Sequence, residues 1–239
     1  MNKPIIGIPL GNKDSTFSRH PHYAMEKNYF HVIAKLGGLP LPLIYNNDDF
    51  DVYLNMVDGL LIPGGSFASP TKWYEESAIE LSPAGDWSAF YEKLTKAAIE
   101  RKIPILGICA GMQFMACVNG GKMTVNAMKN LPTEIDHLNG ADKEFICHKA
   151  LINAGSLLHK LTGELEIDVN SAHKEAVTSV TGDVNICARA EDGCIEAVEM
   201  VNHPFALGVQ WHPEFFCDDT ENPHYKIMKA LIDAAKRYR

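Results

Sequence analysis

Short apolar runs alternate with amphipathic stretches through the first half of the chain, and several of the runs end in glycine pairs. A short continuous apolar run is typical of a strand buried on both faces, whereas apolar residues at helical spacing indicate a helix packed beside it. This alternation predicts a parallel sheet with helical connections. The predicted strands are Ile5–Leu10, Leu39–Ile44, Gly59–Ile62 and Ile103–Ile108, and the predicted helices are His22–Leu36, Asp48–Met56, Trp87–Arg101 and Ala110–Val118.

Beyond Lys122 the pattern changes to short strands joined by polar turns, followed by a helix over Pro223–Tyr238 whose basic end suits the negative pole of its dipole. Neither a linker nor a repeat interrupts the chain, so we expect residues 1–239 to form one domain. The predicted strands of this half are Glu144–Ile152, Leu165–Val169, Val184–Arg189, Ile195–Met200 and Ala206–Gln210.

One connection is unusually long. Ser66–Gly85 is rich in serine and proline and carries two neighbouring aromatic residues, Trp73 and Tyr74. Because long connections inside a compact domain are usually functional, we expect a lid whose aromatic side chains contact the substrate.

Composition and charge narrow the classes of partner. Apolar residues make up 46% of the 239 residues, which rules out a disordered chain, and 22 basic against 30 acidic residues give a formal charge of −8. Without a dense basic stripe, neither nucleic acid nor an anionic membrane is an expected partner. No apolar run approaches the ~20 residues that span a bilayer, and the first residues lack a cleavable signal, so we expect a cytoplasmic protein.

The six cysteines are expected to be reduced thiols, because a chain of this size needs no disulfides. No CxxC pair is present, and the spacing of the cysteines and histidines does not indicate zinc. We therefore expect no metal and no cofactor.

The segment Pro104–Gln113, PILGICAGMQ, places Cys109 between two glycines where a predicted strand meets a predicted helix. Glycines two positions before and after let strand and helix approach closely, which forces the central residue into a strained turn with its side chain exposed. At a helix N-terminus, free N–H groups and the dipole favour thiolate over thiol. A buried apolar cysteine between closely packed glycines is the alternative, but the strand-to-helix position favours a nucleophile.

A cysteine nucleophile needs a base, and the base needs a group that orients it. In Leu207–Phe215, LGVQWHPEF, His212 follows a buried strand at the edge where open α/β sheets place their sites. Pro213 fixes a local bend, so Glu214 is placed to accept the imidazole N–H and leave the other nitrogen facing Cys109.

A glycine pair, Gly64-Gly65, ends another predicted strand in Leu61–Gly65, LIPGG. Glycines let backbone N–H groups approach a substrate without intervening side chains. The N–H groups of Gly65 and Ala110 would then form an oxyanion hole. Taken alone the motif is weak, since most glycine pairs are turns.

Together, LIPGG, PILGICAGMQ and LGVQWHPEF resemble, in order and spacing, the class I glutamine amidotransferase superfamily. Within it the chain is most similar to the γ-glutamyl hydrolases grouped with γ-glutamyl-γ-aminobutyrate hydrolase, the peptidase C26 group. The opening PIIGIPL and the stretch AKLGGLPLPLI resemble that group's first strand, helix and second strand, and residues 170–173 resemble its N-S-x-H segment. The similarity thus extends through nearly the whole chain.

This resemblance implies an α/β fold, a flavodoxin-like, doubly wound and mostly parallel sheet with a small antiparallel portion in the second half. It implies a catalytic triad of Cys109, His212 and Glu214, with oxyanion donors at Gly65 and Ala110. The substrate-binding residues that it implies are Gly64, Gln113, Asn170, Ser171 and His173.

The implied reaction is hydrolysis of a γ-glutamyl amide through a γ-glutamyl thioester, with release of glutamate. Three alternatives stay open: a glutaminase that supplies ammonia to a separate synthetase, a γ-glutamyl transferase, and a binding module without activity. A homodimer is also compatible with the sequence. The leaving amine is in doubt, because the group usually has Arg where Ala110 stands, an Asp near Ser66-Phe67, and SYHHQ where residues 171–175 read SAHKE.

Overall fold

Five parallel strands form one half of a nine-stranded sheet, in the order β4-β1-β5-β6-β13. The structure is a computed structural model that describes residues 3–13, 18–65, 69–76, 86–131 and 133–238. In the register of the two central strands, Ile108 of β6 pairs with Val209 of β13, so the residues that follow both strands emerge at the same edge. The strands are β1 (Ile5–Pro9), β4 (Leu39–Leu43), β5 (Gly59–Ile62), β6 (Ile105–Ile108) and β13 (Ala206–Val209).

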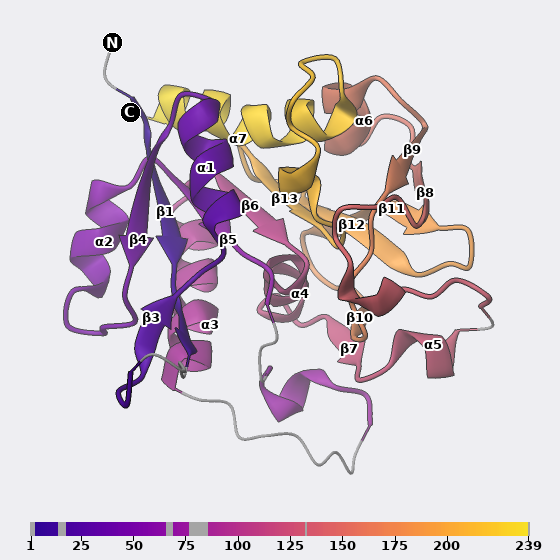
Figure 1. Cartoon of the computed structure of the whole chain (residues 1–239), viewed down its shortest axis with the longest axis horizontal. Coiled ribbons are helices and arrows are strands. Elements are labelled where there is room, and N and C mark those ends of the chain that lie inside the picture. Colours follow the sequence, from indigo (N-terminus) through magenta and orange to yellow (C-terminus); the bar gives the residue numbers. More distant parts are fainter. Residues whose placement is uncertain (1–2, 14–17, 66–68, 77–85, 132, 239) are drawn as a thin grey trace.

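The sheet continues from β13 into four antiparallel strands, in the order β12-β11-β8-β9 (Figure 1). The predicted mixed α/β sheet is therefore confirmed, with an antiparallel portion nearly as large as the parallel one. The antiparallel strands are β8 (His148–Ile152), β9 (Glu166–Val169), β11 (Val184–Ala190) and β12 (Ile195–Met200).

Helices cover both faces of the sheet, because side chains of each strand alternate between two hydrophobic cores. In β5, Leu61 belongs to the core beneath one set of helices, and Leu60 and Ile62 belong to the other. The first set comprises α1 (Lys27–Lys35), α6 (Leu157–Thr162) and α7 (Pro223–Tyr238); the second comprises α2 (Phe50–Met56), α3 (Asp86–Glu100) and α4 (Ala110–Cys117) (Figure 1).

The predicted helix over His22–Leu36 is wrong in its first turn, since α1 begins only at Lys27. Residues before it form β3 (His22–Ala24), which pairs with β2 (Gly11–Lys13) in a separate hairpin. A second small sheet joins β7 (Lys122–Thr124) to β10 (Ala176–Ser179). The short helix α5 (Ala127–Asn130) and the 3-10 turns η1 (Thr71–Trp73), η2 (Asn139–Ala141) and η3 (Pro213–Phe215) complete the described elements.

The expected lid lies partly outside the described residues, which include 69–76 but not 66–68 or 77–85. Trp73 packs edge-on against Phe114 of α4, with ring centroids 4.9 Å apart. Tyr74 is buried as well, and its hydroxyl donates to Glu175 at 2.9 Å. Neither aromatic side chain lines the pocket described below, so the prediction that they contact the substrate is wrong.

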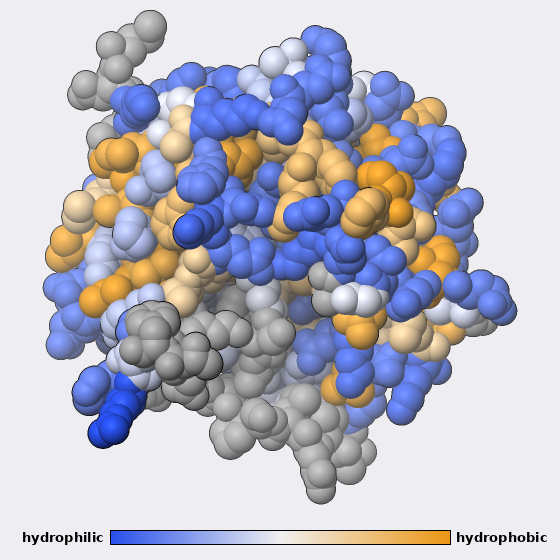
Figure 2. All heavy atoms as spheres, in the orientation of Figure 1, coloured by the Kyte–Doolittle hydropathy of each residue, from blue (hydrophilic) through white to orange (hydrophobic). Residues whose placement is uncertain are grey.

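Hydrophilic and hydrophobic residues are interspersed on the face of the molecule shown in Figure 2. Within the described residues, none of the helices combines the length and the apolar character required to cross a bilayer.

Candidate active site

Cys109 occupies a sharp turn between β6 and α4. Its φ of 52° and ψ of −109° lie in a region that L-residues rarely adopt. Backbone bonds hold both sides of the turn: the Cys109 N–H donates to Val209 of β13 at 2.8 Å, and the Cys109 carbonyl accepts from Gln113 at 3.2 Å. The strained backbone is thus fixed by the sheet on one side and by the helix on the other.

The flanking glycines are sterically required at this turn. A Cβ on Gly111 would lie 2.1 Å from the carbonyl oxygen of Ile62 in β5, and one on Gly107 would lie 2.6 Å from the backbone of Gly111. No side chain fits at either position without moving backbone. The two glycines around Cys109 are therefore required because α4 packs very closely against β5 and β6.

His212 follows β13 and lies next to the turn at Cys109. The imidazole hydrogen-bonds the Cys109 thiol, and its Nδ1 lies 2.8 Å from a carboxylate oxygen of Glu214 on η3. All three side chains are at least nine-tenths buried. The structure thus brings together Cys109, His212 and Glu214, with His212 between the other two.

Electrostatics in this group favour an ion pair. Burial by itself would raise the pKa of Cys109, but the hydrogen bond and charge of His212 lower it below the ordinary thiol value. Burial would lower the pKa of His212, yet Glu214 and Cys109 raise it to about 9. On the same helix, burial raises the pKa of Cys117 to about 12, so only the cysteine at the turn gains thiolate character.

Asn170 holds the backbone of His212. Its side-chain oxygen accepts the His212 N–H at 2.8 Å, and its side-chain nitrogen donates to the His212 carbonyl at 3.1 Å. Asn170 is fully buried and does not line the pocket. Ser171 is also buried, and its hydroxyl donates to the carbonyl of His137 at 2.7 Å. These two residues therefore support the site from behind.

Tyr29 contacts the site, although the helical spacing of the sequence had indicated only a core residue. Its hydroxyl accepts the N–H of Gly64 at 3.0 Å and lies 3.5 Å from His212 Nδ1. Burial, with Glu214 nearby, raises the pKa of Tyr29 well above its usual value, so the hydroxyl stays protonated. The N–H of Gly64 is thus engaged by Tyr29, while Gly65 and Ala110, the first residue of α4, also line the pocket.

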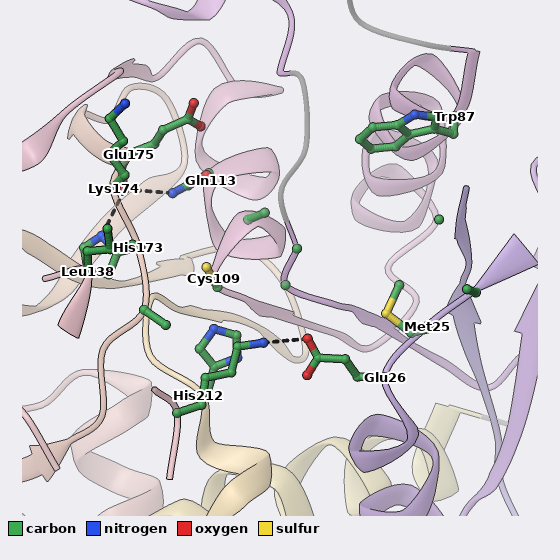
Figure 3. Close-up of a pocket in the computed structure, with 17 residues that line it drawn as sticks. Met25, Glu26, Trp87, Cys109, Gln113, Leu138, His173, Lys174, Glu175 and His212 are labelled. Carbon is green, nitrogen blue, oxygen red and sulfur yellow. Dashed lines mark hydrogen bonds and ion pairs between the residues drawn. The ribbon is translucent and has the colours of Figure 1, made fainter. Parts of the chain in front are cut away.

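A pocket of ≈ 800 Å³ opens above Cys109. In Figure 3, Cys109 lies between Gln113 and His212, with Met25 and Trp87 on one side and the segment 173–175 on the other. Gln113 is held by the carbonyl of Glu175 at 3.1 Å and by the side chain of Gln210 at 3.2 Å. The volume suits a small molecule, and its floor is the cysteine.

The pocket wall carries charges of both signs. Lys143 and Glu26 form an ion pair of 2.6 Å across the wall, while Lys174 and Glu175 lie near Gln113. A ligand with both an ammonium and a carboxylate group would find partners for each. Sequence motifs did not indicate Lys143 or Glu26, because these residues come from loops without a recognisable pattern.

Of the other predicted substrate-binding residues, Gly64, Gln113 and His173 line the pocket. The Nε2 of His173 faces Glu196, at 3.6 Å. Among the described residues, His173 belongs to one group able to hold a metal ion, with His137, Cys194 and Glu196, whose ligating atoms lie within 4.8 Å of one another. Sequence spacing did not reveal this group, since its members come from separate segments.

Comparisons with known proteins show what the chain is similar to. The chain is 32% identical to a putative glutamine amidotransferase-like protein of Rickettsia prowazekii, over 98% of each chain. It is 30% identical to γ-glutamyl-γ-aminobutyrate hydrolase PuuD of Escherichia coli, over 98% of this chain and 92% of that protein. A solved structure of a putative GMP synthase protein from Thermoplasma acidophilum matches the fold, with a TM-score of 0.64 at 16% identity over 99% of this chain and 98% of that one.

The family model of Peptidase C26 matches residues 4–214, which include the turn at Cys109 as well as His212 and Glu214. Since this match covers most of the 239 residues, the resemblance inferred from the motifs is confirmed. The chain belongs to the Peptidase C26 family.

Proposed function

We propose that the protein hydrolyses γ-glutamyl amides with Cys109 as nucleophile, His212 as acid and base, and Glu214 as the group that orients His212. The observation that carries this proposal is the hydrogen-bonded series from Cys109 through His212 to Glu214 at the floor of a pocket. Its family and its similarity to a γ-glutamyl-γ-aminobutyrate hydrolase support the choice of substrate class.

In the first step, the Cys109 thiolate attacks the γ-carbonyl carbon, and the carbonyl π electrons move to the oxygen. The N–H groups of Gly65 and Ala110 stabilise this oxyanion. When the tetrahedral intermediate collapses, the C–N bond breaks and the His212 imidazolium gives its proton to the leaving nitrogen. The products of this step are a free amine and a γ-glutamyl thioester on Cys109.

In the second step, neutral His212 takes a proton from water, and the resulting hydroxide adds to the thioester carbon. Collapse breaks the C–S bond, so glutamate leaves and Cys109 returns as thiolate beside the His212 imidazolium. Glu214 holds the imidazole in one tautomer and offsets its charge in both steps.

The glutamyl half of the substrate carries an α-ammonium and an α-carboxylate, and the wall supplies charges of both signs at Glu26, Lys143, Lys174 and Glu175. The leaving amine lies beyond Cys109, next to Ala110. Because Ala110 provides space and no cation, we expect the enzyme to accept leaving amines that lack a carboxylate at least as well as amino acids.

The experiment is a panel of γ-glutamyl amides of amino acids, monoamines and polyamines beside free glutamine, with glutamate release as the readout. Cys109→Ala is the blank. Adding hydroxylamine should capture the thioester as γ-glutamyl hydroxamate. The proposal fails if wild-type protein releases glutamate no faster than Cys109→Ala from every amide.

The same panel distinguishes the alternatives. Turnover of glutamine that requires a second protein would favour a glutaminase component of a synthetase. Conjugates formed with added amines, at the expense of glutamate, would favour a γ-glutamyl transferase.

A further inference from the structure

Three imidazoles converge on the carboxylate of Glu196, away from the cysteine turn. His137 Nδ1 lies 3.6 Å from Glu196 Oε1, His148 Nε2 lies 3.7 Å from it, and His173 Nε2 lies 3.6 Å from it. The four residues come from different segments: the loop before η2, the start of β8, the loop after β9, and β12. The antiparallel half of the sheet is what brings them together.

These contacts are not hydrogen bonds. Separations of 3.6–3.7 Å exceed the 2.7–3.2 Å of an N–H···O bond. Among the described residues, no hydrogen bond of ordinary geometry reaches the three facing nitrogens or either oxygen of Glu196, although all four side chains are buried. Five orphaned polar atoms at one point would cost several kcal/mol unless something else binds them.

The opposite nitrogen of each imidazole does have a hydrogen-bond acceptor. His137 Nε2 lies 2.8 Å from Asp192, His148 Nδ1 lies 3.2 Å from the carbonyl of Lys149, and His173 Nδ1 lies 3.0 Å from the carbonyl of Glu175. These acceptors favour a proton on the outer nitrogen of each ring. The inner nitrogens of all three rings face the same oxygen, Glu196 Oε1, while their outer nitrogens have acceptors, and metal-bound histidines commonly have such an outer acceptor.

We propose that His137, His148, His173 and Glu196 form a zinc site. For bonds of roughly 2.0–2.2 Å, two ligands of a tetrahedral zinc ion lie roughly 3.3–3.6 Å apart. The three distances from Glu196 Oε1, 3.6–3.7 Å, lie at or just above the upper end of that range. Three neutral imidazoles and a carboxylate form a donor set suited to zinc, and they leave the ion a charge that the nearby Asp192 helps to neutralise.

Cys194 lies beside the ion in this assignment. Its sulfur is within 4.8 Å of the ligating atoms of His137, His173 and Glu196. The histidines and the carboxylate already complete a four-coordinate site, so a thiolate is not required.

The site is structural, because four protein ligands close it and its members are buried. It connects the segment around His137 to the segment around His173, which the backbone joins already through a bond from the His173 N–H to the His137 carbonyl at 2.9 Å. His173 and its neighbours 172, 174 and 175 form one wall of the pocket above Cys109. The ion therefore fixes that wall while taking no part in the chemistry.

The test uses the full chain without a histidine tag, carrying Cys109→Ala so that the nucleophile cannot hold an ion. Protein is dialysed against a chelator, titrated with Zn²⁺, and analysed for metal content and melting temperature. We expect one zinc per chain and a higher melting temperature. Co²⁺ in its place should give the intense visible absorption of a tetrahedral site, without a sulfur charge-transfer band.

Single substitutions locate the ion. His148→Gln and Glu196→Gln should each lose the stoichiometric zinc, whereas His31→Gln, at an exposed histidine on α1, should keep it. Asp192→Asn, which changes only a group behind His137, should weaken zinc binding about 10–100-fold.

The proposal is overturned if the chelated Cys109→Ala protein takes up no zinc and shows no rise in melting temperature. This result is measured on the Cys109→Ala protein, which keeps all four proposed ligands. It therefore tests the proposal even if the ligand variants do not fold. A sulfur-to-cobalt band, lost in Cys194→Ser, would overturn the ligand set by putting Cys194 in it.

Discussion

Two buried groups in this molecule combine histidine with glutamate, and they differ in the distance from the imidazole nitrogen to the carboxylate oxygen. His212 and Glu214 are two residues apart in sequence, and their facing atoms are 2.8 Å apart, which is a hydrogen bond. The three imidazoles around Glu196 stop at 3.6–3.7 Å from it. The distance between His212 and Glu214 is that of a hydrogen bond, whereas the longer distances around Glu196 leave room for a metal ion between the side chains.

The surroundings of the two groups explain this difference. His212 and Glu214 follow a parallel strand and are set by a local bend at Pro213, so few residues decide their geometry. The group around Glu196 is assembled by pairing between antiparallel strands. The presence of histidine beside glutamate therefore does not by itself distinguish a catalytic base from a metal ligand. The partner of the second ring nitrogen and the length of the histidine–glutamate contact do.

The largest expected effect is that of Cys109→Ala, which should lower kcat at least about 10⁴-fold while leaving the melting temperature nearly unchanged. The thiol is the nucleophile in the proposed reaction and contributes little to packing. Glutamate release and calorimetry measure the two quantities.

Cys117→Ala is the matched control, since this buried thiol lies on the same helix and has its pKa raised to about 12. It should lose some stability and keep its activity. A thiol reagent should label Cys109 and spare Cys117; the reverse order of labelling would contradict the ion pair at the turn.

Glu214→Gln should lower kcat about 10²–10⁴-fold, because the carboxylate no longer orients and stabilises the imidazolium. It should also change the pH profile of kcat/KM. In the wild type, activity should rise as Cys109 ionises, at a pH below its ordinary pKa, and fall near pH 9 as His212 loses its proton. Removing the negative charge lowers the pKa of His212, so the alkaline limb should move to lower pH; an unmoved limb would argue against the pairing.

Gly111→Ala should destabilise the fold by about 3 kcal/mol, because its Cβ would meet the Ile62 carbonyl at 2.1 Å. The melting temperature should fall by roughly 6–12 °C. Gly155→Ala is the comparison: that glycine has a φ of +81° but open space around it, so about 1 kcal/mol of backbone strain is expected. Equal effects at both positions would mean that the close approach at the turn is not what requires glycine.

Removing zinc should lower stability by about 2.7 kcal/mol relative to protein with free ion at about 100 times Kd. This corresponds to roughly 5–10 °C in melting temperature. Glu214→Gln should leave this difference intact and Glu196→Gln should abolish it, so the same substitution at the two glutamates separates the two groups. Thermal denaturation with and without chelator measures it.

Tyr29→Phe should have the smallest effect. The substitution leaves the buried Gly64 N–H without its acceptor, at a cost of roughly 1–2 kcal/mol in stability. Activity should fall by no more than about tenfold, since the hydroxyl lies 3.5 Å from His212 while Glu214 lies closer. A loss as large as that of Glu214→Gln would mean that Tyr29 orients the base.

Much of the fold could be predicted because buried strands and long helices carry strong patterns. The predicted bounds of Gly59–Ile62, Ile195–Met200 and Pro223–Tyr238 agree with β5, β12 and α7. Strands of three residues, such as those of the β2–β3 hairpin, are too short to show alternation. The amphipathic pattern beginning at His22 therefore merged a strand and a helix.

The candidate site was predictable where its parts are local. Cys109 has its glycines two residues away, and Glu214 is two residues from His212. Tyr29 and Lys143 act through contacts with distant segments, and the histidines around Glu196 are separated by 11 to 36 residues along the chain. Only the folded chain shows that these residues meet their partners.

Asn170 meets the backbone of His212 as a neighbouring strand would, donating to its carbonyl and accepting from its N–H. The side-chain amide of Asn170 thus forms the pair of hydrogen bonds that a neighbouring strand would form, at the point where β13 has ended. Aspartate, almost the same in shape, has no donor for the carbonyl, and leucine has neither group. The main chain of His212 thus requires asparagine at position 170, whether or not a substrate contacts that side chain.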